Sequence, residues 1–148
     1  MKLYFAADHA GLALKNRLIN FAVGLGYVIV DAGAFSADVN DDYPDYVIPA
    51  VEAAVKTGSL AVVIGGSGNG ECIAANKIKG IRAALCHDVF SAQMSREHND
   101  ANVLSIGAGF VSEEGAKQAI MLWLETKFSG EERHIRRIKE LDSLKSDN

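Results

Sequence analysis

The sequence has few residues of several kinds, and each shortage excludes a class of protein. Among its 148 residues are only two cysteines, which lack CxxC spacing and cannot form the disulfide framework of a small secreted domain. Basic residues are not in excess, because 15 Lys and Arg stand against 19 Asp and Glu. The resulting charge of −4 gives no electrostatic reason to expect a nucleic-acid partner.

Long uncharged runs are also missing. The longest, from Thr57 to Gly70, has 14 residues and five glycines, which is shorter than the roughly 18 apolar residues typical of a membrane span. After Lys2, only five apolar residues precede Asp8, too few for a signal peptide. The sequence therefore predicts no membrane span and a protein of the reducing cytoplasm, with Cys72 and Cys86 as free thiols.

Linker signals are scarce as well. Proline occurs twice, no Ser/Gly-rich stretch separates two halves, and no repeat at a solenoid period is visible. With 49% apolar residues, the chain is predicted to form a single domain over residues 1–148.

Short aliphatic runs alternate with longer segments of helical periodicity. In the longer segments apolar residues recur every three or four positions, as at Leu14, Leu18 and Phe21. Strands that are apolar on both faces and joined by amphipathic helices predict a parallel sheet covered on both sides, which is a doubly wound, Rossmann-like α/β fold of three layers. The five runs expected as strands are Leu3–Ala7, Tyr27–Val30, Leu60–Gly65, Ala83–Cys86 and Val103–Gly107.

Three local signals refine the helices. Pro49 interrupts the second helical segment and is tolerable in a first turn if that helix begins near Asp45, because first-turn N–H groups lack intrahelical partners. Ser112, followed by two glutamates, predicts an N-cap for the fifth helix. A last helix from about Glu131 to Leu144 carries an apolar stripe and needs a surface to cover.

A glycine-rich segment follows the third expected strand, where ligands of such folds bind. Residues 65–71 read Gly-Gly-Ser-Gly-Asn-Gly-Glu, and four glycines in six residues let backbone N–H groups converge on an anion at the start of a helix. The spacing matches neither the dinucleotide fingerprint nor the P-loop. A turn without a ligand is the plainer alternative, but the carboxylate of Glu71 at its mouth indicates a reacting group rather than a simple anchor.

Two histidine motifs are further candidates. Asp8-His9 ends the first strand, although an Asp at such a position is commonly a helix cap. His98 lies at the end of the fourth helix, where a histidine can simply interact favourably with the negative end of the helix dipole. Asn99 is the expected left-handed cap of this helix.

Arg133 and Arg137 lie one turn apart on the last helix, where they favour a phosphate or carboxylate between them, the alternative being plain surface charge. Metal ligation is not indicated. Residues 38–42 resemble the start of a calcium loop without its Gly and Glu, and the histidines and cysteines show no zinc spacing. Cys72 is a candidate nucleophile, but an apolar helix position more often holds an inert thiol.

Six short motifs occur together and in order along the chain. Their combination resembles the B type of ribose-5-phosphate isomerase, within the family that also holds galactose-6-phosphate isomerase subunits, from about Lys2 to Leu141. Each motif is short, but the combination is specific. The motifs are Asp8–Gly11, Asp42–Tyr46, Gly65–Glu71 with Ala74–Lys77, Gly80–Ala83, Ser95–Leu104, and Arg133-His134 with Arg137.

The resemblance implies a five-stranded parallel sheet, a metal-independent aldose–ketose isomerase without cofactors, and a homodimer with two active sites at the subunit interface. One subunit would supply the Asp-His and glycine-loop residues and the other the His-Asn pair, with the last helix reaching across; a tetramer stays open. Family members carry the base as a Cys at the position of Gly65 or as a Glu at the position of Glu71. This sequence is similar to the second group.

The implied reaction interconverts ribose 5-phosphate and ribulose 5-phosphate through an enediolate. Glu71 is the expected base, Ser67 binds O1 and O2, and His98 with Asp8 opens the sugar ring. The other expected substrate contacts come from the backbone amides of Gly66, Gly68, Asn69 and Gly70, from Asn99 and Tyr43 at the sugar, and from His9, Arg133, His134 and Arg137 at the phosphate.

One departure leaves the substrate open. Family members commonly carry an Arg after the fifth strand, where this chain has Gly109. An isomerase of a six-carbon sugar phosphate, such as allose or galactose 6-phosphate, is therefore an alternative. A non-catalytic sugar-phosphate sensor is another, although a sensor needs no base and this chain keeps Glu71. A receiver or flavodoxin-like domain is disfavoured, because the third strand ends in glycines rather than a phosphorylatable Asp.

Overall fold

Five parallel strands form the centre of the structure, a computed structural model that describes residues 1–144. They are β1 (Lys2–Ala7), β2 (Val28–Asp31), β3 (Leu60–Gly65), β4 (Ala83–Leu85) and β5 (Val103–Gly107). Strand β1 pairs with both β2 and β3, and β5 lies between β3 and β4, so that the order is β2-β1-β3-β5-β4.

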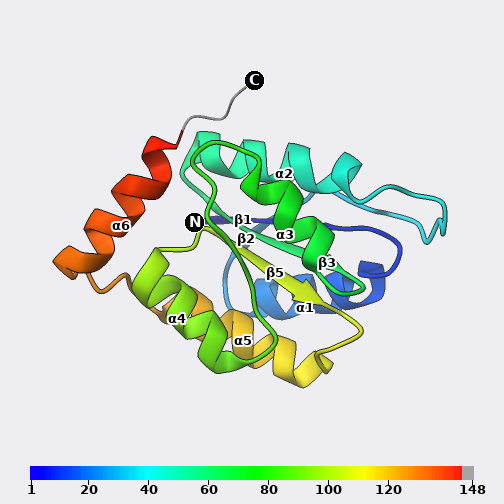
Figure 1. The fold of residues 1–148 in the computed structure, drawn as a ribbon. Helices are drawn as coiled ribbons and strands as arrows, with labels where there is room; N and C mark the ends of the chain where they lie inside the picture. Colours follow the sequence, from blue (N-terminus) through cyan, green and yellow to red (C-terminus); the bar gives the residue numbers. More distant parts are fainter. Residues whose placement is uncertain (145–148) are drawn as a thin grey trace.

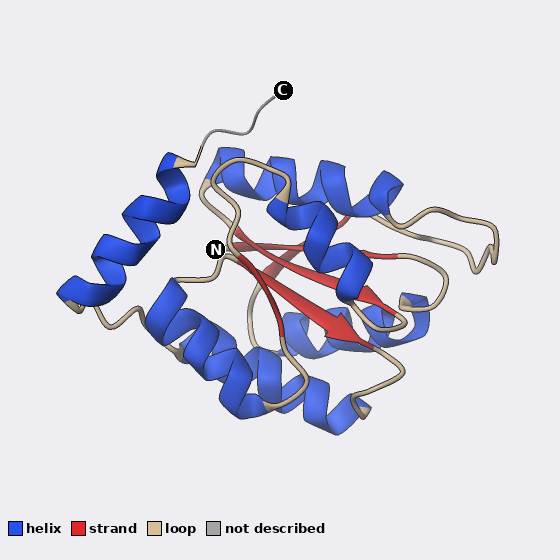
Figure 2. Cartoon of the chain, viewed as in Figure 1, coloured by secondary structure: helices blue, strands red, loops and turns tan. Residues whose placement is uncertain are grey.

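Helices cover both faces of this sheet. They are α1 (Leu12–Gly24), α2 (Pro44–Thr57), α3 (Asn69–Asn76), α4 (Val89–Asn99), α5 (Glu113–Glu125) and α6 (Glu132–Ser143). Figures 1 and 2 show α2 and α3 on one face and α1, α4 and α5 on the other. Each face has its own apolar cluster: Phe5 and Trp123 belong to one, Val51 and Val63 to the other. The predicted three-layer, doubly wound fold is confirmed.

The strands lie where the aliphatic runs predict them, because strands buried on both faces give continuous apolar sequence. Strands β3 and β5 match the expected ranges, β1 and β4 differ by one residue at one end, and β2 is shifted by one residue at both ends. The expected cap of α5 is also confirmed, since the Ser112 hydroxyl accepts a hydrogen bond from the Gly115 amide at 3.0 Å.

Two local expectations are wrong. Pro49 is the sixth residue of α2, beyond the first turn, so it removes an N–H that would otherwise bond the Asp45 carbonyl. Asn99 is the last residue of α4, and the left-handed position falls one residue later, at Asp100 with φ 45°. Asp, like Asn, enters this region more readily than most residues with a side chain.

Helix α6 lies outside the three layers, beside α4 (Figure 1). The helix expected from Glu131 to Leu144 is observed over Glu132–Ser143, and Leu141 on it is 52% exposed. The prediction that α6 covers a partner subunit concerns a second chain and stays a prediction. Over residues 1–144, no helix is long and apolar enough to cross a membrane. The predicted single domain also includes residues 145–148, which lie outside the described part.

Candidate active site

The segments that follow β1 and β3 meet at the carboxyl edge of the sheet. These two strands are neighbours, and the chain leaves them toward opposite faces, through α1 after β1 and through α3 after β3. Ligands of open α/β sheets bind where the chain diverges in this way. The Asp8-His9 motif and the glycine-rich segment both lie at this point.

Glu71 lies in the first turn of α3, and its side chain folds back over the end of β3. Its carboxyl group occupies the space in which a Cβ at position 65 would stand. Because the Glu71 carboxyl group fills this space, its position requires glycine at 65. Glu71 is only 4% exposed. The buried carboxylate is held at the mouth of the glycine-rich segment, as the sequence predicts.

The environment of Glu71 favours its neutral form more than water does. Burial raises the pKa of the Glu71 carboxyl, a backbone hydrogen bond partly opposes this, and the charge of Asp8 raises the pKa further. A carboxylate with a raised pKa is a stronger base near neutral pH than an exposed one. Glu71 therefore combines a fixed position with the electrostatics of a proton-transfer group.

The glycine-rich segment is wedged between neighbouring strands. Gly68 is left-handed, with φ 79°, and a Cβ on it would lie 2.8 Å from Leu85 Cδ1 and 2.9 Å from the carbonyl carbon of Ile106. The Ser67 hydroxyl accepts a hydrogen bond from the Asn69 amide at 3.2 Å. These contacts leave little freedom to the loop, so its amides are held in fixed directions before any ligand arrives.

Tyr43, the residue before α2, closes one side of this segment. A Cβ at Gly70 would lie 2.5 Å from Tyr43 Cζ and 2.6 Å from its hydroxyl oxygen. The phenol ring therefore packs directly on the backbone of Gly70, at the first turn of α3. Tyr43 and the glycine-rich segment are therefore neighbours within one chain.

Asp8 and His9 are both held by hydrogen bonds at the end of β1. Asp8 Oδ1 accepts from the amides of Ala10 and Gly11, at 3.0 and 3.2 Å, in the turn that precedes α1. The N-cap of α1 is Gly11, which has no side-chain cap bond, so the alternative of Asp8 as the helix cap is wrong. The His9 ring contacts Asp41, with Nδ1 2.6 Å from Oδ1, and Asp41 Oδ2 accepts from the His9 amide at 3.0 Å.

Asp41 is a site residue that the sequence analysis missed. Its hydrogen bond to the ring raises the pKa of His9, and the charges of Asp41 and Asp8 act in the same direction. The carboxylate thus orients the ring and favours its cationic form. The acidic run around residues 38–45 was a visible signal, but nothing in it marked position 41 as the partner of a residue 32 positions away.

Asp8, His9 and Asp41 also form the one group within residues 1–144 whose spacing would suit a metal ion, with ligand atoms within 4.8 Å of one another. The hydrogen bonds just described already account for this closeness, since each of the three side chains has a protein partner. These three side chains are poor ligands for a tightly held metal ion, because His9 Nδ1 is already hydrogen-bonded to Asp41. We assign no metal to it.

A second group of predicted residues gathers around the end of α4. The rings of His98 and His134 stack with centroids 4.5 Å apart and an interplanar angle of 14°. His134 is 5% exposed and its Nε2 has no hydrogen-bond partner. Burial lowers the pKa of His134, and the nearby positive charge of Arg133 lowers it further. This ring is therefore a neutral packing partner of His98 near pH 7.

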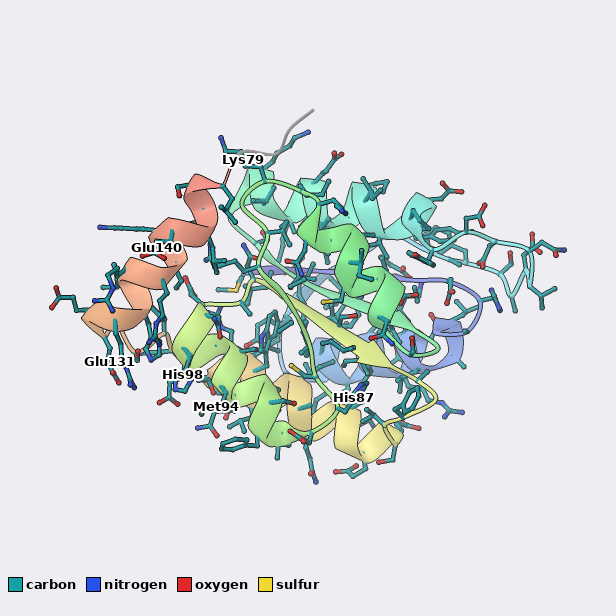
Figure 3. The ribbon with its side chains drawn as sticks, viewed as in Figure 1. Lys79, His87, Met94, His98, Glu131 and Glu140 are labelled. Atoms are coloured by element: carbon teal, nitrogen blue, oxygen red, sulfur yellow. The ribbon has the colours of Figure 1, made fainter. Side chains whose placement is uncertain are left out.

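The two groups lie at opposite edges of the sheet. Helix α4 starts after the carboxyl end of β4 and ends before the amino end of β5, and its 11 residues span about 16 Å. Figure 3 shows His98 at one end of α4, next to α6, and His87 beyond the other end. One chain thus brings Glu71, Ser67, Tyr43, Asp8 and His9 together, and separately His98, Asn99 and the α6 residues.

Comparisons with known proteins match this chain over nearly its whole length. A family model described as Ribose/Galactose Isomerase matches residues 3–141. The chain belongs to the ribose/galactose isomerase family. "Ribose-5-phosphate isomerase B" of Mycobacterium leprae is 44% identical over 93% of this chain and 86% of the relative. The Escherichia coli protein of the same name is 39% identical over 97% and 95%.

Solved structures of this family have the same fold. Ribose-5-phosphate isomerase B from Mycoplasma genitalium, described "with bound Ribulose-5-phosphate", superposes with a TM-score of 0.92 at 35% identity, covering 95% of this chain and 93% of that one. The Clostridium thermocellum enzyme gives 0.91 at 40% identity, covering 96% and 95%. The predicted family resemblance is therefore confirmed over nearly the whole chain.

Gly109, where the sequence analysis expects an Arg in other family members, lies next to the glycine-rich segment. The Gly109 amide donates to the Gly66 carbonyl at 2.9 Å, and a Cβ at 109 would lie 3.1 Å from that oxygen. Position 109 thus borders the glycine-rich segment. Gly109 places no side chain at this rim of the candidate site.

Proposed function

We propose that this protein interconverts ribose 5-phosphate and ribulose 5-phosphate. The observation that carries the proposal is the buried carboxylate of Glu71, held against Gly65 at the start of α3 in a member of the ribose/galactose isomerase family. In the reaction, the proton on C2 of the aldose moves to C1, and a hydroxyl proton moves from O2 to O1. A single base that reaches both carbons performs the first transfer in both directions.

Glu71 is that base in the proposal. It takes the C2 proton, and the negative charge that develops on the enediolate oxygens is held by the backbone amides of Gly66, Gly68, Asn69 and Gly70, which the packed loop keeps in place. Ser67 lies in the same segment, and its hydroxyl binds O1 and O2 and passes the proton between them.

Ring opening precedes this step, because ribose 5-phosphate is mostly cyclic. One group takes the proton of the C1 hydroxyl while another gives a proton to the ring oxygen as the C1–O bond breaks. His98 and Asp8 form this acid–base pair, and Asn99 orients the open chain. The stack with neutral His134 holds the His98 ring in one plane. In the proposal, His134 therefore supports the His98 ring in addition to its place at the phosphate end.

The phosphate is held by cations. His9 is favoured in its charged form by Asp41, and Arg133 and Arg137 are exposed on one face of α6, where they can reach outward. The Arg133 Nε already donates to Glu131 at 2.9 Å, so part of its guanidinium remains for a ligand. Tyr43 packs beside the sugar.

Such a site is complete only when two copies meet. Because His98 and Asn99 lie at the edge of the sheet opposite to Glu71, a substrate bound to Glu71 meets the His-Asn pair of a second subunit. The exposed apolar residues of α6, among them Ile135 and Leu141, suit contact with that subunit. A homodimer with two shared sites satisfies this requirement, and a tetramer of such dimers satisfies it equally.

The proposal is tested by a coupled assay with ribose 5-phosphate, beside allose 6-phosphate. Glu71→Gln is expected to lower turnover by at least about 10²-fold while leaving sugar-phosphate binding largely intact. Cys72→Ala, one residue further along α3, is the matched control and is expected to stay active. Comparable turnover by Glu71→Gln would refute the base assignment. Tight binding of either sugar without turnover by the unmodified protein would favour a sensor.

A second candidate substrate rests on Gly109. Because this position borders the glycine-rich segment and carries no side chain, a longer sugar phosphate has room at the rim. A kcat/KM for allose 6-phosphate above that for ribose 5-phosphate would assign the protein to six-carbon substrates with the same chemistry.

A further inference from the structure

Arg82 belongs to the Gly80–Ala83 motif, to which the proposed reaction gives no role. It is the residue before β4, and its side chain is 19% exposed. The guanidinium lies on the wall of a cavity of about 620 Å³ between α6 and residues 76–84. Asn99 and Asp142 line the same cavity, so Arg82 faces both the end of α4 and α6.

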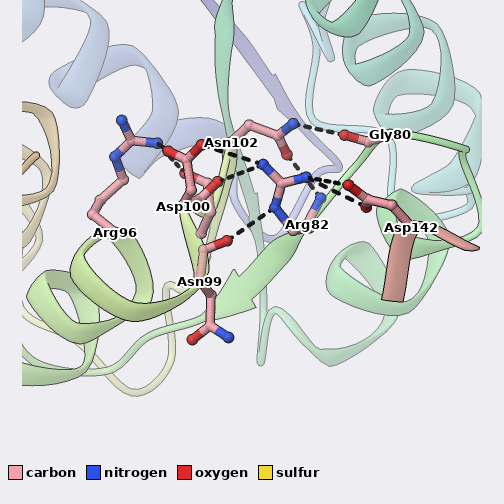
Figure 4. A network of polar contacts seen from close by, with 8 residues as sticks. Gly80, Arg82, Arg96, Asn99, Asp100, Asn102 and Asp142 are labelled. Carbon is pink, nitrogen blue, oxygen red and sulfur yellow. Dashed lines mark hydrogen bonds and ion pairs between the residues drawn. The ribbon is translucent and has the colours of Figure 1, made fainter. Parts of the chain in front are cut away.

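The Arg82 guanidinium binds the carboxyl end of α4 directly (Figure 4). Its Nε donates to the Asn99 carbonyl at 2.9 Å, and one terminal nitrogen donates to the Asp100 carbonyl at 3.1 Å and to an Asp100 carboxylate oxygen at 3.4 Å. Carbonyls in the last turn of a helix have no partner within the helix. Arg82 supplies these partners immediately after His98.

The other terminal nitrogen of Arg82 reaches α6. It lies 3.5 and 3.4 Å from the two carboxylate oxygens of Asp142. Helix α6 carries His134, whose ring stacks on His98. One planar guanidinium thus contacts the helix end that bears His98 and the helix that packs against His98.

The backbone beneath Arg82 is also fixed. Its amide donates to the Asn102 side chain at 2.8 Å, and Asn102 in turn donates to the Gly80 carbonyl at 2.8 Å. A guanidinium has five N–H donors, and Arg82 directs them at five acceptor atoms of Asn99, Asp100 and Asp142. The N–H donors of Arg82 are therefore used by acceptors within the chain, which argues against a role of Arg82 in binding an anion in the cavity.

We infer that Arg82 is a positioning residue for His98 and Asn99. It fixes the end of α4 relative to α6, so that the His98 ring and the Asn99 side chain point at a substrate in one orientation. The inference rests on the proposed isomerase function, in which His98 opens the sugar ring. Lysine cannot replace Arg82 in this role, because an ammonium group is a point donor and cannot span the acceptors of two helices.

The test separates ring opening from proton transfer. Turnover of ribose 5-phosphate needs both steps. Exchange of a C1 hydrogen of ribulose 5-phosphate with solvent deuterium needs Glu71 but no ring opening, because this ketose has its 5-hydroxyl esterified and stays open. Both rates are measured for the unmodified protein, for Arg82→Met and Arg82→Lys, and for Arg17→Met as the matched control, since Arg17 is 62% exposed and pairs with Glu113 on the surface.

Arg82→Met is expected to lower ribose 5-phosphate turnover by about tenfold or more, because displacing a catalytic group by about 1 Å costs up to about 10²-fold. Exchange is expected to fall by less than about threefold, since Glu71 and the glycine loop stay in place and only the contribution of Asn99 is lost. Arg82→Lys is expected to resemble Arg82→Met, and Arg17→Met the unmodified protein. If Arg82→Met fails to fold, Arg82→Lys carries the comparison.

Equal losses in the two assays would make Arg82 a general structural residue and would overturn the inference, as would unchanged turnover or full activity of Arg82→Lys. An unmodified protein with neither turnover nor exchange would instead refute the proposed function, and the inference with it. Turnover and exchange by the unmodified protein, with no selective loss in the variants, would refute the inference alone.

Discussion

Adding one methyl group at Gly65 is expected to inactivate the enzyme by displacing Glu71, the proposed base. The three heavy atoms nearest to a Cβ at position 65 are the carboxyl carbon and the two oxygens of Glu71, and all three would overlap with it. Ordinary van der Waals contact of a Cβ lies at 3.4–4 Å, so the carboxylate must retreat by about 1 Å or more. The backbone of Gly65 is not left-handed, so alanine adds no strain of its own.

The size of the effect follows from this displacement. A misplacement of about 1 Å costs up to about 10²-fold in rate, and we expect kcat of Gly65→Ala to fall by about that factor. Stability should change by only about 1 kcal/mol, because the obstructing atoms end a flexible side chain. Gly24→Ala is the matched control, since a Cβ there meets nothing within 4 Å.

The assay is ribose 5-phosphate turnover together with urea unfolding. In Gly65→Ala/Glu71→Ala the added methyl group finds the space vacated, so this variant should be more stable than Gly65→Ala and equally inactive. Full turnover by Gly65→Ala would show that the carboxylate is not needed where the structure has it, and the reasoning would be wrong.

Two further predictions concern titration. The proposed base Glu71 would act in its ionised form, and the pKa of its carboxyl is raised by burial and by Asp8. The kcat should therefore fall as the pH drops through a value above the ordinary 4.5; a midpoint at or below the ordinary value would contradict this. Because Asp41 raises the pKa of His9, Asp41→Asn should lower the titration midpoint of the His9 ring seen by NMR. The KM for ribose 5-phosphate should then begin to rise at a lower pH in this variant than in the unmodified protein, with kcat little changed; an unshifted midpoint would exclude the pairing in solution.

Features set by neighbouring residues were predictable from the sequence. The strands follow from continuous aliphatic runs, the Ser112 cap from its flanking glutamates, and the glycine turn from four glycines that precede a helix. The place of Glu71 at the mouth of this turn was predictable too. Its contact with Gly65 was not, because only the fold shows that the first turn of α3 returns the side chain over the end of β3. In the proposed function, these elements carry the chemistry of the glycine-loop half of the site.

Contacts between distant segments were not predictable. Asp41 is one of several acidic residues in its stretch, and only the fold shows that it meets His9. Arg82 is 17 residues from Asn99 and 60 from Asp142, and no periodicity links them. The left-handed residue after α4 was placed one position early because Asn and Asp suit it about equally, and the sequence offers both.

The separation of the two half-sites follows from helix direction. In a parallel sheet, each crossover helix runs back from the carboxyl edge to the amino edge, so residues at its start and its end cannot share a ligand. Glu71 and Asp8 are near helix starts, whereas His98 and Asn99 end α4. If all act on one sugar, the substrate must lie between two chains. Mixing Glu71→Gln with His98→Asn protomers should then restore activity at one of the two sites of each mixed dimer. Mixtures that stay inactive after subunit exchange would place the whole reaction within a single chain.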